Sequence, residues 1–349
     1  MSDSAQQPVT PAQYPPVSIV MPVRNESRHL ENAVTRVLGQ EYPGTLEVVI
    51  AVGPSTDDTH AIAERLAATD PRVRLVDNPT GRTPAGLNMA IAAAGHDIVI
   101  RVDGHGELAD GYVATAVETL QRTGAANVGG IMDAQGVTPF EQAVAVAYTS
   151  RLGLGGSTFH LRTSPQGPAD TVFLGSFRKD ALQAVGGYDE TLYRAQDWEL
   201  NYRLRQHGET VWFTPELRVT YRPRSTLRAL AEQFYETGKW RREVVRRHPE
   251  TLNARYLASP LAVVAVVGGV AVGAHGSYHR VGPMRLGWLA PLGYLAMVVA
   301  GAAALRRDLP WPVRARLPLV FATMHMCWGL GFLVGLCPGE RPEGPSGPL

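Results

Sequence analysis

Short apolar runs alternate with amphipathic segments through the first third of the chain. The runs are rich in Val and Ile, as in strands that are buried on both faces, and the segments between them repeat apolar residues three and four positions apart, as in helices that cover a sheet. This alternation predicts an α/β fold with a mostly parallel central sheet and helices on both faces. The expected strands are residues 17–21, 46–52, 73–76 and 98–102.

The chain is less regular after residue 125. Glycine- and proline-rich loops at 153–157 and 165–168 are a natural place for a lid or for a loop that binds an acceptor. A helix is expected to open at Gln196, and residues 227–248 read as a helix that becomes increasingly basic. Further strands are expected at 127–132, 173–177, 210–213 and 219–221.

Three long apolar runs follow, at 256–274, 286–305 and 317–336. Each has about the ~20 residues that a bilayer-spanning helix needs, and none contains Asp, Glu, Lys or Arg. Buried core helices are the alternative, but three successive runs separated by short charged loops favour transmembrane helices.

The composition narrows the class of protein. Of 349 residues, 45% are hydrophobic and 19% charged, and the formal net charge is +1, so we expect a folded protein that does not bind nucleic acid. Cys327 and Cys337 lie in or at the end of the last apolar run and offer neither a disulfide framework nor a metal-ligand spacing.

These patterns divide the chain into four parts. Residues 1–16 are polar, lack the features of a signal peptide and are expected to be a disordered lead-in. Residues 17–250 are expected to form one soluble domain, 251–337 three transmembrane helices, and 338–349 a flexible tail.

The distribution of Lys and Arg predicts the orientation in a cell membrane. A basic run is often only a solvated helix face, but the one at 239–247 comes directly before an apolar run, which favours a segment that lies against anionic lipids. The loop at 306–316 is also basic, whereas the tail carries only Arg341. We therefore expect the soluble domain to be cytoplasmic and the C-terminus to lie outside.

Acidic residues follow three of the expected parallel strands. Glu26, Asp57 and Asp103 come after the first, second and fourth strands, and the carboxyl ends of such strands face the ligand crevice of an open α/β sheet. Asp103 and His105, with Gly104 between them, can turn both side chains toward one metal-bound anion. The alternative is that Asp103-Gly104 is only a turn after a buried strand.

In this order, the motifs of residues 17–248 resemble those of the family 2 glycosyltransferases of the GT-A fold, in particular the membrane-attached group similar to succinoglycan-biosynthesis enzymes. Each motif alone is weak, but seven in sequence order are a strong signal. The motifs are Ser18 to Glu26, Ser55 to Thr59, Gly81 to Asn88, Arg101 to His105, Val185 to Glu190, Gln196 to Leu200 and Gln233 to Arg241.

The resemblance implies roles for the acidic residues. Asp103 and His105 stand where the family has its Asp-x-Asp, which binds a divalent cation that bridges the donor diphosphate. With an imidazole in place of the second carboxylate, Mn²⁺ is expected over Mg²⁺, and His105 as a bystander is the alternative. Asp197 matches the general base that deprotonates the acceptor hydroxyl. Its alternative role is to stabilise the start of a helix.

The resemblance also implies residues that bind the donor, and the chain departs from the family pattern at two positions. Val52 replaces an Asp that reads the uracil edge in many relatives, and Gln196 replaces the usual Glu before the base, a charge for which Glu199 is a candidate replacement. Asp57 is equally suited to capping the following helix. The implied donor-binding residues are Pro22, Arg24, Glu26, Asp57, Arg82, Asp103, Gln233, Trp240 and Arg241.

The resemblance thus predicts an inverting, metal-dependent glycosyltransferase. Its donor would be a nucleotide sugar, with UDP expected and GDP or dTDP open, and its acceptor a lipid-linked or polysaccharide molecule in exopolysaccharide or cell-envelope glycan synthesis. A non-catalytic nucleotide-sugar-binding membrane scaffold is the alternative. A nucleotidyltransferase is disfavoured because no Gly-rich phosphate loop follows the first strand, and three spans are too few for a processive synthase that builds its own channel.

Overall fold

A computed structural model describes residues 14–154, 158–305 and 308–336. Most of the expected lead-in at 1–16 and the whole of the expected tail at 338–349 lie outside these residues. Contacts within the chain define two compact units. One holds residues up to 133 together with 162–220, and the other holds 134–161 together with 221–336. The sequence analysis drew its boundary at residue 250, whereas this division groups residues 134–161 and 221–250 with the apolar helices.

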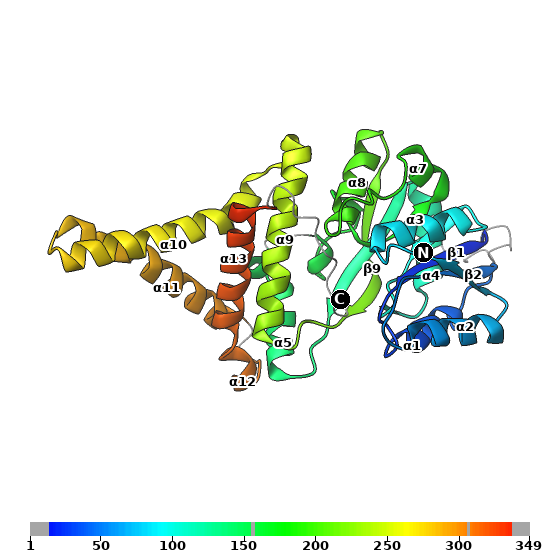
Figure 1. Ribbon diagram of the computed structural model, residues 1–349, viewed down its shortest axis with the longest axis horizontal. Coiled ribbons are helices and arrows are strands. Elements are labelled where there is room, and N and C mark those ends of the chain that lie inside the picture. Colours follow the sequence, from blue (N-terminus) through cyan, green and yellow to red (C-terminus); the bar gives the residue numbers. More distant parts are fainter. Residues whose placement is uncertain (1–13, 155–157, 306–307, 337–349) are drawn as a thin grey trace, which may run out of the picture. The chain divides into compact units, whose positions relative to one another are not determined.

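The first unit is built on a mixed sheet in the order β3-β2-β1-β4-β8-β6-β9-β5, with β7 paired to β9 (Figure 1). The strands β3, β2, β1 and β4 are parallel, as the alternation predicts. Their bounds are Val73–Asp77, Leu46–Val52, Val17–Val23 and Ile98–Arg101. The α/β class is therefore confirmed, although the sheet is parallel only over this half.

The other half of the sheet is antiparallel. β9 is one continuous strand, Val211–Tyr221, where the sequence analysis expected two strands, at 210–213 and 219–221. The strand includes Pro215, which cannot donate to the ladder, and its two ends pair with different neighbours, β7 and β5. The remaining strands are β5 Glu107–Leu108, β6 Asn127–Ala134, β7 Gly167–Pro168 and β8 Phe173–Arg178.

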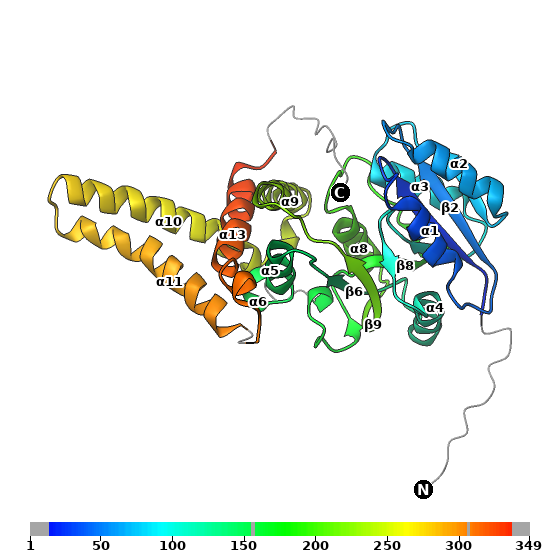
Figure 2. The ribbon, with the colours of Figure 1, turned by 90° about the horizontal axis from the view of Figure 1, so that it is seen from below.

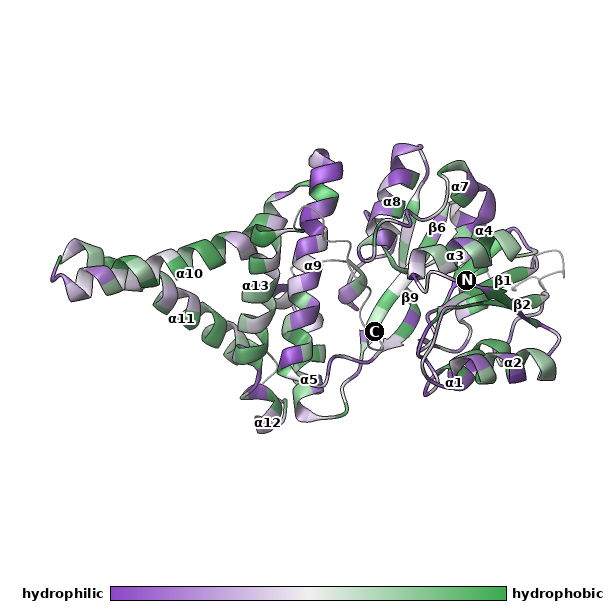
Figure 3. Ribbon diagram, viewed as in Figure 1, coloured by the Kyte–Doolittle hydropathy of each residue, from purple (hydrophilic) through white to green (hydrophobic). Residues whose placement is uncertain are grey.

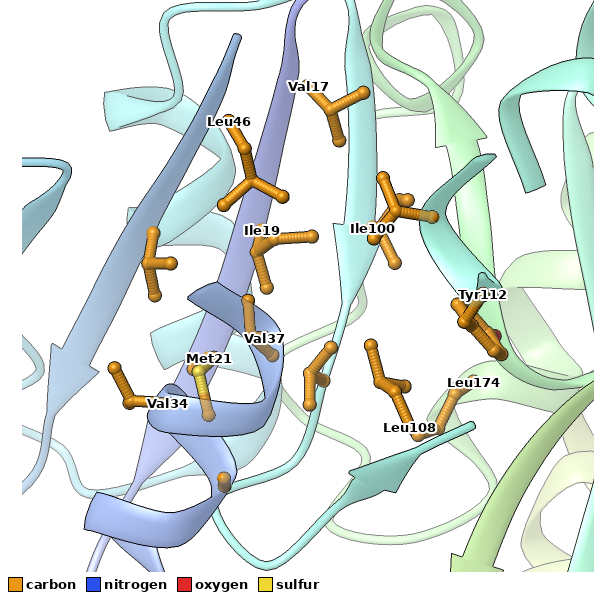
Figure 4. Close-up of a cluster of buried hydrophobic side chains, with 14 of the residues drawn as sticks. Val17, Ile19, Met21, Val34, Val37, Leu46, Ile100, Leu108, Tyr112 and Leu174 are labelled. Carbon is orange, nitrogen blue, oxygen red and sulfur yellow. The ribbon is translucent and has the colours of Figure 1, made fainter. Parts of the chain in front are cut away.

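The main core lies between the sheet and the helices α1, α2 and α4 (Figures 2 and 4). Ile19 and Met21 of β1 point toward Val34 and Val37 of α1, because alternate strand residues share one face. The opposite face of β1 and β2 is covered by α3 (Figure 1). The helices of this unit are α1 Leu30–Leu38, α2 Thr59–Thr69, α3 Thr83–Ala93, α4 Tyr112–Thr123, α7 Lys179–Ala184 and α8 Gln196–Gln206.

The second unit is helical. Three of its helical segments are long and apolar enough to cross a membrane: Ala254–Tyr278, Pro283–Ala304 and Trp311–Val334. Figure 3 shows these segments as mostly hydrophobic, in contrast to α9. The elements are α5 Pro139–Tyr148, α6 Arg151–Leu154, η2 Thr158–His160, α9 Leu227–Arg247, η3 Pro249–Thr251, α10 Ala254–Tyr278, η4 Pro283–Trp288, α11 Leu289–Ala304, α12 Trp311–Arg314 and α13 Leu317–Val334.

Glycines let α9 pack directly against α13 (Figure 1). A Cβ atom on Gly238 would collide with the Trp328 carbonyl, and one on Gly331 would collide with the Tyr235 carbonyl. Arg242 of α9 donates to the Phe332 carbonyl at 3.2 Å, at the C-terminal end of α13 where the helix dipole favours a cation. The basic helix is therefore fixed along the last apolar helix.

The core of the first unit yields a stability prediction. Ile19 is 0% exposed, so Ile19→Ala leaves a cavity between β1 and α1 and should lower the free energy of unfolding by about 2–5 kcal/mol. Thermal unfolding of the protein in detergent measures the effect. Val137→Ala, at a position 73% exposed, is the control and should change little. Equal midpoints for the two variants would contradict this account of the core.

Candidate active site

The loops that follow β1 and β2 are joined by hydrogen bonds. Asn25 has a positive φ of 56°, a conformation that Asn tolerates better than most residues, and its backbone N–H donates to Ser55 Oγ at 3.1 Å. Its side-chain oxygen accepts from the Thr56 N–H at 2.8 Å. The Glu26 N–H donates to Thr59 Oγ1 at 2.8 Å. These bonds fix where the Glu26 side chain begins.

Asp57 acts within this loop network. Its carboxylate accepts from the Ser27 N–H at 3.1 Å and from the N–H and hydroxyl of Thr59. Although burial opposes them, these hydrogen bonds lower the pKa of Asp57 to about 2. The capping alternative is thus the role for which the structure supplies contacts.

Glu26 and His105 meet across the ends of β1 and β4. The Glu26 carboxylate lies 2.8 Å from His105 Nδ1 and is almost fully buried. Gly104 makes this approach possible, since a Cβ there would lie 2.9 Å from Glu26 Cγ. The other Glu26 oxygen, Oε2, is buried without a hydrogen-bond partner among the described residues. Glu26 therefore holds the imidazole through one oxygen, and the contact with the donor that the resemblance implied stays a prediction.

A buried arginine joins the two residues that the resemblance marks for catalysis. Arg101, at the end of β4, has a side chain only 5% exposed. Its Nε donates to the Asp103 carboxylate at 3.0 Å, and its Nη1 donates to the Asp197 carboxylate at the start of α8. Although burial opposes them, the two carboxylates raise the pKa of Arg101, which stays charged. One cation thus fixes the spacing of two carboxylates.

The chain enters α8 through a strained residue. Ala195, directly before the helix, has a positive φ of 61°, which is unfavourable for a residue with a Cβ by about 1–2 kcal/mol. Asp197 follows in the first turn. Burial raises the pKa of Asp197 and the negative charge of Asp103 raises it further, although Arg101 opposes both effects. The turn therefore places the Asp197 carboxylate, whose side chain is 37% exposed, beside Arg101.

The neighbours of Asp197 on α8 do not replace the negative charge that the family has at the position of Gln196. Gln196 is buried, and its Oε1 has no hydrogen-bond partner among the described residues. Glu199 forms a two-bond ion pair with Arg203, at 2.6 and 2.7 Å, and Arg203 also donates to the Gly187 carbonyl at 2.8 Å. The suggestion that Glu199 compensates for Gln196 is therefore wrong, because its charge is neutralised one turn along the same helix.

The remaining predicted residues of this unit lie in the loops around β1, β2 and α3. Pro22 is paired within β1, and Arg24 Nε donates to the Pro54 carbonyl at 3.2 Å. The Arg82 guanidinium lies 4.7 Å from the centre of the Tyr193 ring. Val52, where many relatives have Asp, is a buried strand residue opposite Asp77 of β3.

Gln233, Trp240 and Arg241 belong to the second unit. Gln233 donates to the Tyr221 hydroxyl at 2.9 Å and accepts from the Tyr148 hydroxyl at 3.2 Å. Trp240 is buried in α9, and the Arg241 guanidinium lies 4.5 Å from the centre of the Tyr256 ring. All three therefore have partners inside the helical unit, and their predicted contact with a donor stays a prediction.

The residues present fit a divalent cation. Asp103 supplies a carboxylate and His105 an imidazole, a mixed O/N donor set that suits Mn²⁺. Metal-bound histidines usually donate their second ring N–H to a carboxylate, and Glu26 occupies that position on Nδ1. The described residues contain no group of three or more His, Cys, Asp or Glu that could hold a metal. Further ligands would come from a bound diphosphate or from water.

Sequence reasoning missed Arg101. The signal was present, since Arg101 interrupts an apolar strand run two residues before Asp103. Strands buried on both faces rarely carry an uncompensated charge, so a charged residue there predicts a buried partner. The second partner, Asp197, lies 96 residues further along the chain and required the fold.

Comparisons with known proteins identify the family. The model of the family "Glycosyl transferase family 2" matches residues 18–186. The chain is 37% identical over 317 residues to the succinoglycan biosynthesis protein ExoA of Rhizobium meliloti, a match that covers 90% of this chain and 93% of that protein. It is 23% identical over 240 residues to a Methanococcus voltae glucuronosyltransferase named for a dolichyl-linked sugar phosphate, covering 66% and 74% of the two chains.

A solved structure shares the fold. The mannosyltransferase PcManGT from Pyrobaculum calidifontis, in complex with GDP-Man and Mn²⁺, superposes with a TM-score of 0.62 at 20% sequence identity. The match covers 93% of this chain and 88% of that one. At this identity the similarity shows the fold alone.

The buried ion pair yields a test that uses pH. Arg101→Met leaves Asp103 and Asp197 close together without their cation, which should lower the free energy of unfolding by about 3 kcal/mol near neutral pH. Without the cation, the folded-state pKa of a carboxyl rises above its unfolded value. The folded protein then gains a proton as the pH falls, so the deficit relative to wild type should shrink toward about pH 5.

Thermal unfolding at both pH values, with divalent metal chelated, measures this deficit. Arg101→Lys is the matched control, because it keeps the charge without the planar fork and should lie between the other two proteins. A deficit that is the same at both pH values would mean that Arg101 stabilises the fold by packing alone.

Proposed function

The chain belongs to glycosyl transferase family 2 and is a glycosyltransferase of the GT-A fold, and we propose that it transfers a sugar from a nucleotide sugar to a hydroxyl group of a lipid-linked or polysaccharide acceptor, with inversion at the anomeric carbon. The observation that carries this proposal is the pair of carboxylates, Asp103 and Asp197, joined by the buried Arg101 at the end of β4. One carboxylate is suited to the donor and the other to the acceptor.

Asp197 acts as the general base. A hydroxyl group is a poor nucleophile until its proton has somewhere to go, and a carboxylate with a raised pKa accepts that proton more readily than an ordinary aspartate. Arg101 keeps Asp197 in place, and it lowers the cost of holding two carboxylates together before the substrates arrive. A single base without a second nucleophile favours inversion.

Asp103 and His105 would hold the divalent cation, with Mn²⁺ preferred, and Glu26 would keep the imidazole in its binding orientation. When bound, such an ion stabilises the negative charge that develops on the departing nucleoside diphosphate. The complex of PcManGT contains Mn²⁺ and GDP-Man, which supports a metal and a nucleotide-sugar donor here.

The relatives suggest the biological setting. ExoA is named for succinoglycan biosynthesis, and the M. voltae enzyme is named for a dolichyl-linked sugar phosphate. We therefore place this enzyme in exopolysaccharide or cell-envelope glycan synthesis, anchored in the cell membrane by its three apolar helical segments. The excess of Lys and Arg around 239–247 and 306–316 supports a cytoplasmic catalytic unit.

The nucleotide and metal can be tested by binding. The protein in mild detergent is titrated with UDP, GDP and dTDP, with and without Mn²⁺. We expect Mn²⁺-dependent binding of one nucleotide, UDP first among them, and its loss in Asp103→Ala. Glu26→Gln should lower the affinity for Mn²⁺ by about 10–100-fold, because it removes the charged partner of the metal-binding imidazole. Metal-independent binding in both wild type and Asp103→Ala would reject this metal site.

The base is tested separately by turnover. Asp197→Asn keeps the shape of the side chain but cannot accept the proton, so the rate of transfer should fall by about 10²–10⁴-fold while nucleotide affinity stays the same. Asp180→Asn, on an exposed side chain, is the matched control. An unchanged rate in Asp197→Asn would exclude Asp197 as the base. A wild-type protein that binds nucleotide but transfers no sugar would support the scaffold alternative.

A further inference from the structure

Basic side chains converge where the first membrane-crossing helix begins. Tyr256, in the first turn of α10, is buried, and two guanidinium groups lie over its ring. The Arg241 guanidinium is 4.5 Å from the ring centre and the Arg255 guanidinium is 5.0 Å from it. Arg255 also donates to the Tyr256 hydroxyl at 3.0 Å. One ring therefore contacts two cations.

Like charges that contact one ring repel each other, and burial strengthens the repulsion. Burial lowers the pKa of Arg241, and the charge of Arg255 lowers it further. A bound anion between Arg241 and Arg255 would remove the repulsion.

A third group completes the cluster. His160 is 8% exposed, and its Nδ1 is buried without a hydrogen-bond partner among the described residues. Burial and the nearby charge of Arg255 lower its pKa to about 3, so the imidazole is neutral. Its ring is held against Phe159 and Tyr148, at 4.1 and 6.1 Å between ring centres.

The position of these residues in the fold narrows the class of anion that they would bind. The N-terminal end of the 25-residue helix α10 adds the positive end of its dipole, and its first turn contains no acidic residue. Residues downstream of Arg255 are apolar enough to cross a membrane, so Arg255 lies at the level where lipid phosphates are found. The planar guanidinium group of arginine can donate two parallel hydrogen bonds to the oxygens of a phosphate.

We propose that Arg241, Arg255 and His160 bind the phosphate or diphosphate group of a lipid, and that this lipid carries the acceptor sugar. That the lipid carries the acceptor sugar rests on the proposed function, whereas the binding of a lipid phosphate does not. The site would hold the lipid by its phosphate, and it would act without the metal.

Binding to the full-length protein tests the site. The protein in mild detergent, with divalent metal chelated, is titrated with farnesyl diphosphate and with inorganic pyrophosphate. Trp328 stacks on Tyr256 with ring centres 6.3 Å apart, so its fluorescence can report binding beside a calorimetric measurement. We expect farnesyl diphosphate to bind more tightly than pyrophosphate.

Single variants should separate the site from the rest of the surface. Arg255→Gln and Arg241→Gln should each weaken farnesyl diphosphate binding by about tenfold, because each removes a charge-assisted hydrogen bond. Arg255 is exposed, so its variant is not expected to disturb folding. Arg280→Gln, beyond the other end of α10, is the matched control and should leave the affinity unchanged.

Three results would overturn the inference. Equal affinity of wild type and the Arg241→Gln, Arg255→Gln double variant would exclude the site. Equal affinity for pyrophosphate and farnesyl diphosphate would exclude a lipid ligand. Loss of binding in Asp103→Ala would assign the probe to the donor site. Mn²⁺-dependent nucleotide binding is measured on the same proteins, so failure of this site is distinguishable from failure of the proposed function.

Discussion

The catalytic unit depends on one buried cation with two carboxylate partners. Arg101 sits at the end of a strand whose other residues are apolar, and a charge in that position is tolerated only if it is paired. The pairing requires β4 and α8 to meet at fixed positions, and it accounts for the strained entry at Ala195, which presents Asp197 to the guanidinium. The same interaction therefore stabilises the unit and fixes the position of the proposed base.

Much of the fold could be predicted from local pattern. The parallel half of the sheet follows from the Val- and Ile-rich runs, and the three long helical segments follow from uncharged stretches of sufficient length. These features depend on neighbouring residues only. β9 was predicted as two strands, whereas it is one strand whose two ends pair with separate partners, which local sequence does not reveal.

The site could be predicted less completely, because its contacts span long stretches of chain. Glu26 and His105 are 79 residues apart, and Arg101 and Asp197 are 96 apart. Motifs indicate that such residues matter, but not which of them touch. The resemblance thus implied Glu26 as a donor contact, but it did not reveal the contact of Glu26 with His105. The Glu199–Arg203 pair is different, since its i,i+4 spacing was visible in the sequence and would have excluded Glu199 as a substitute for a missing charge.

The charge balance around Arg101 offers one explanation for both departures from the family pattern in the catalytic motifs. The family pattern has carboxylates at the positions of His105 and Gln196. Arg101 already pairs with two carboxylates, Asp103 and Asp197, and Glu26 lies against His105, so further carboxylates at positions 105 and 196 would add like charges beside existing ones. An imidazole at 105 keeps a metal donor and an amide at 196 keeps the polarity, while neither adds negative charge. The two substitutions are therefore best understood together, as adjustments to one electrostatic site.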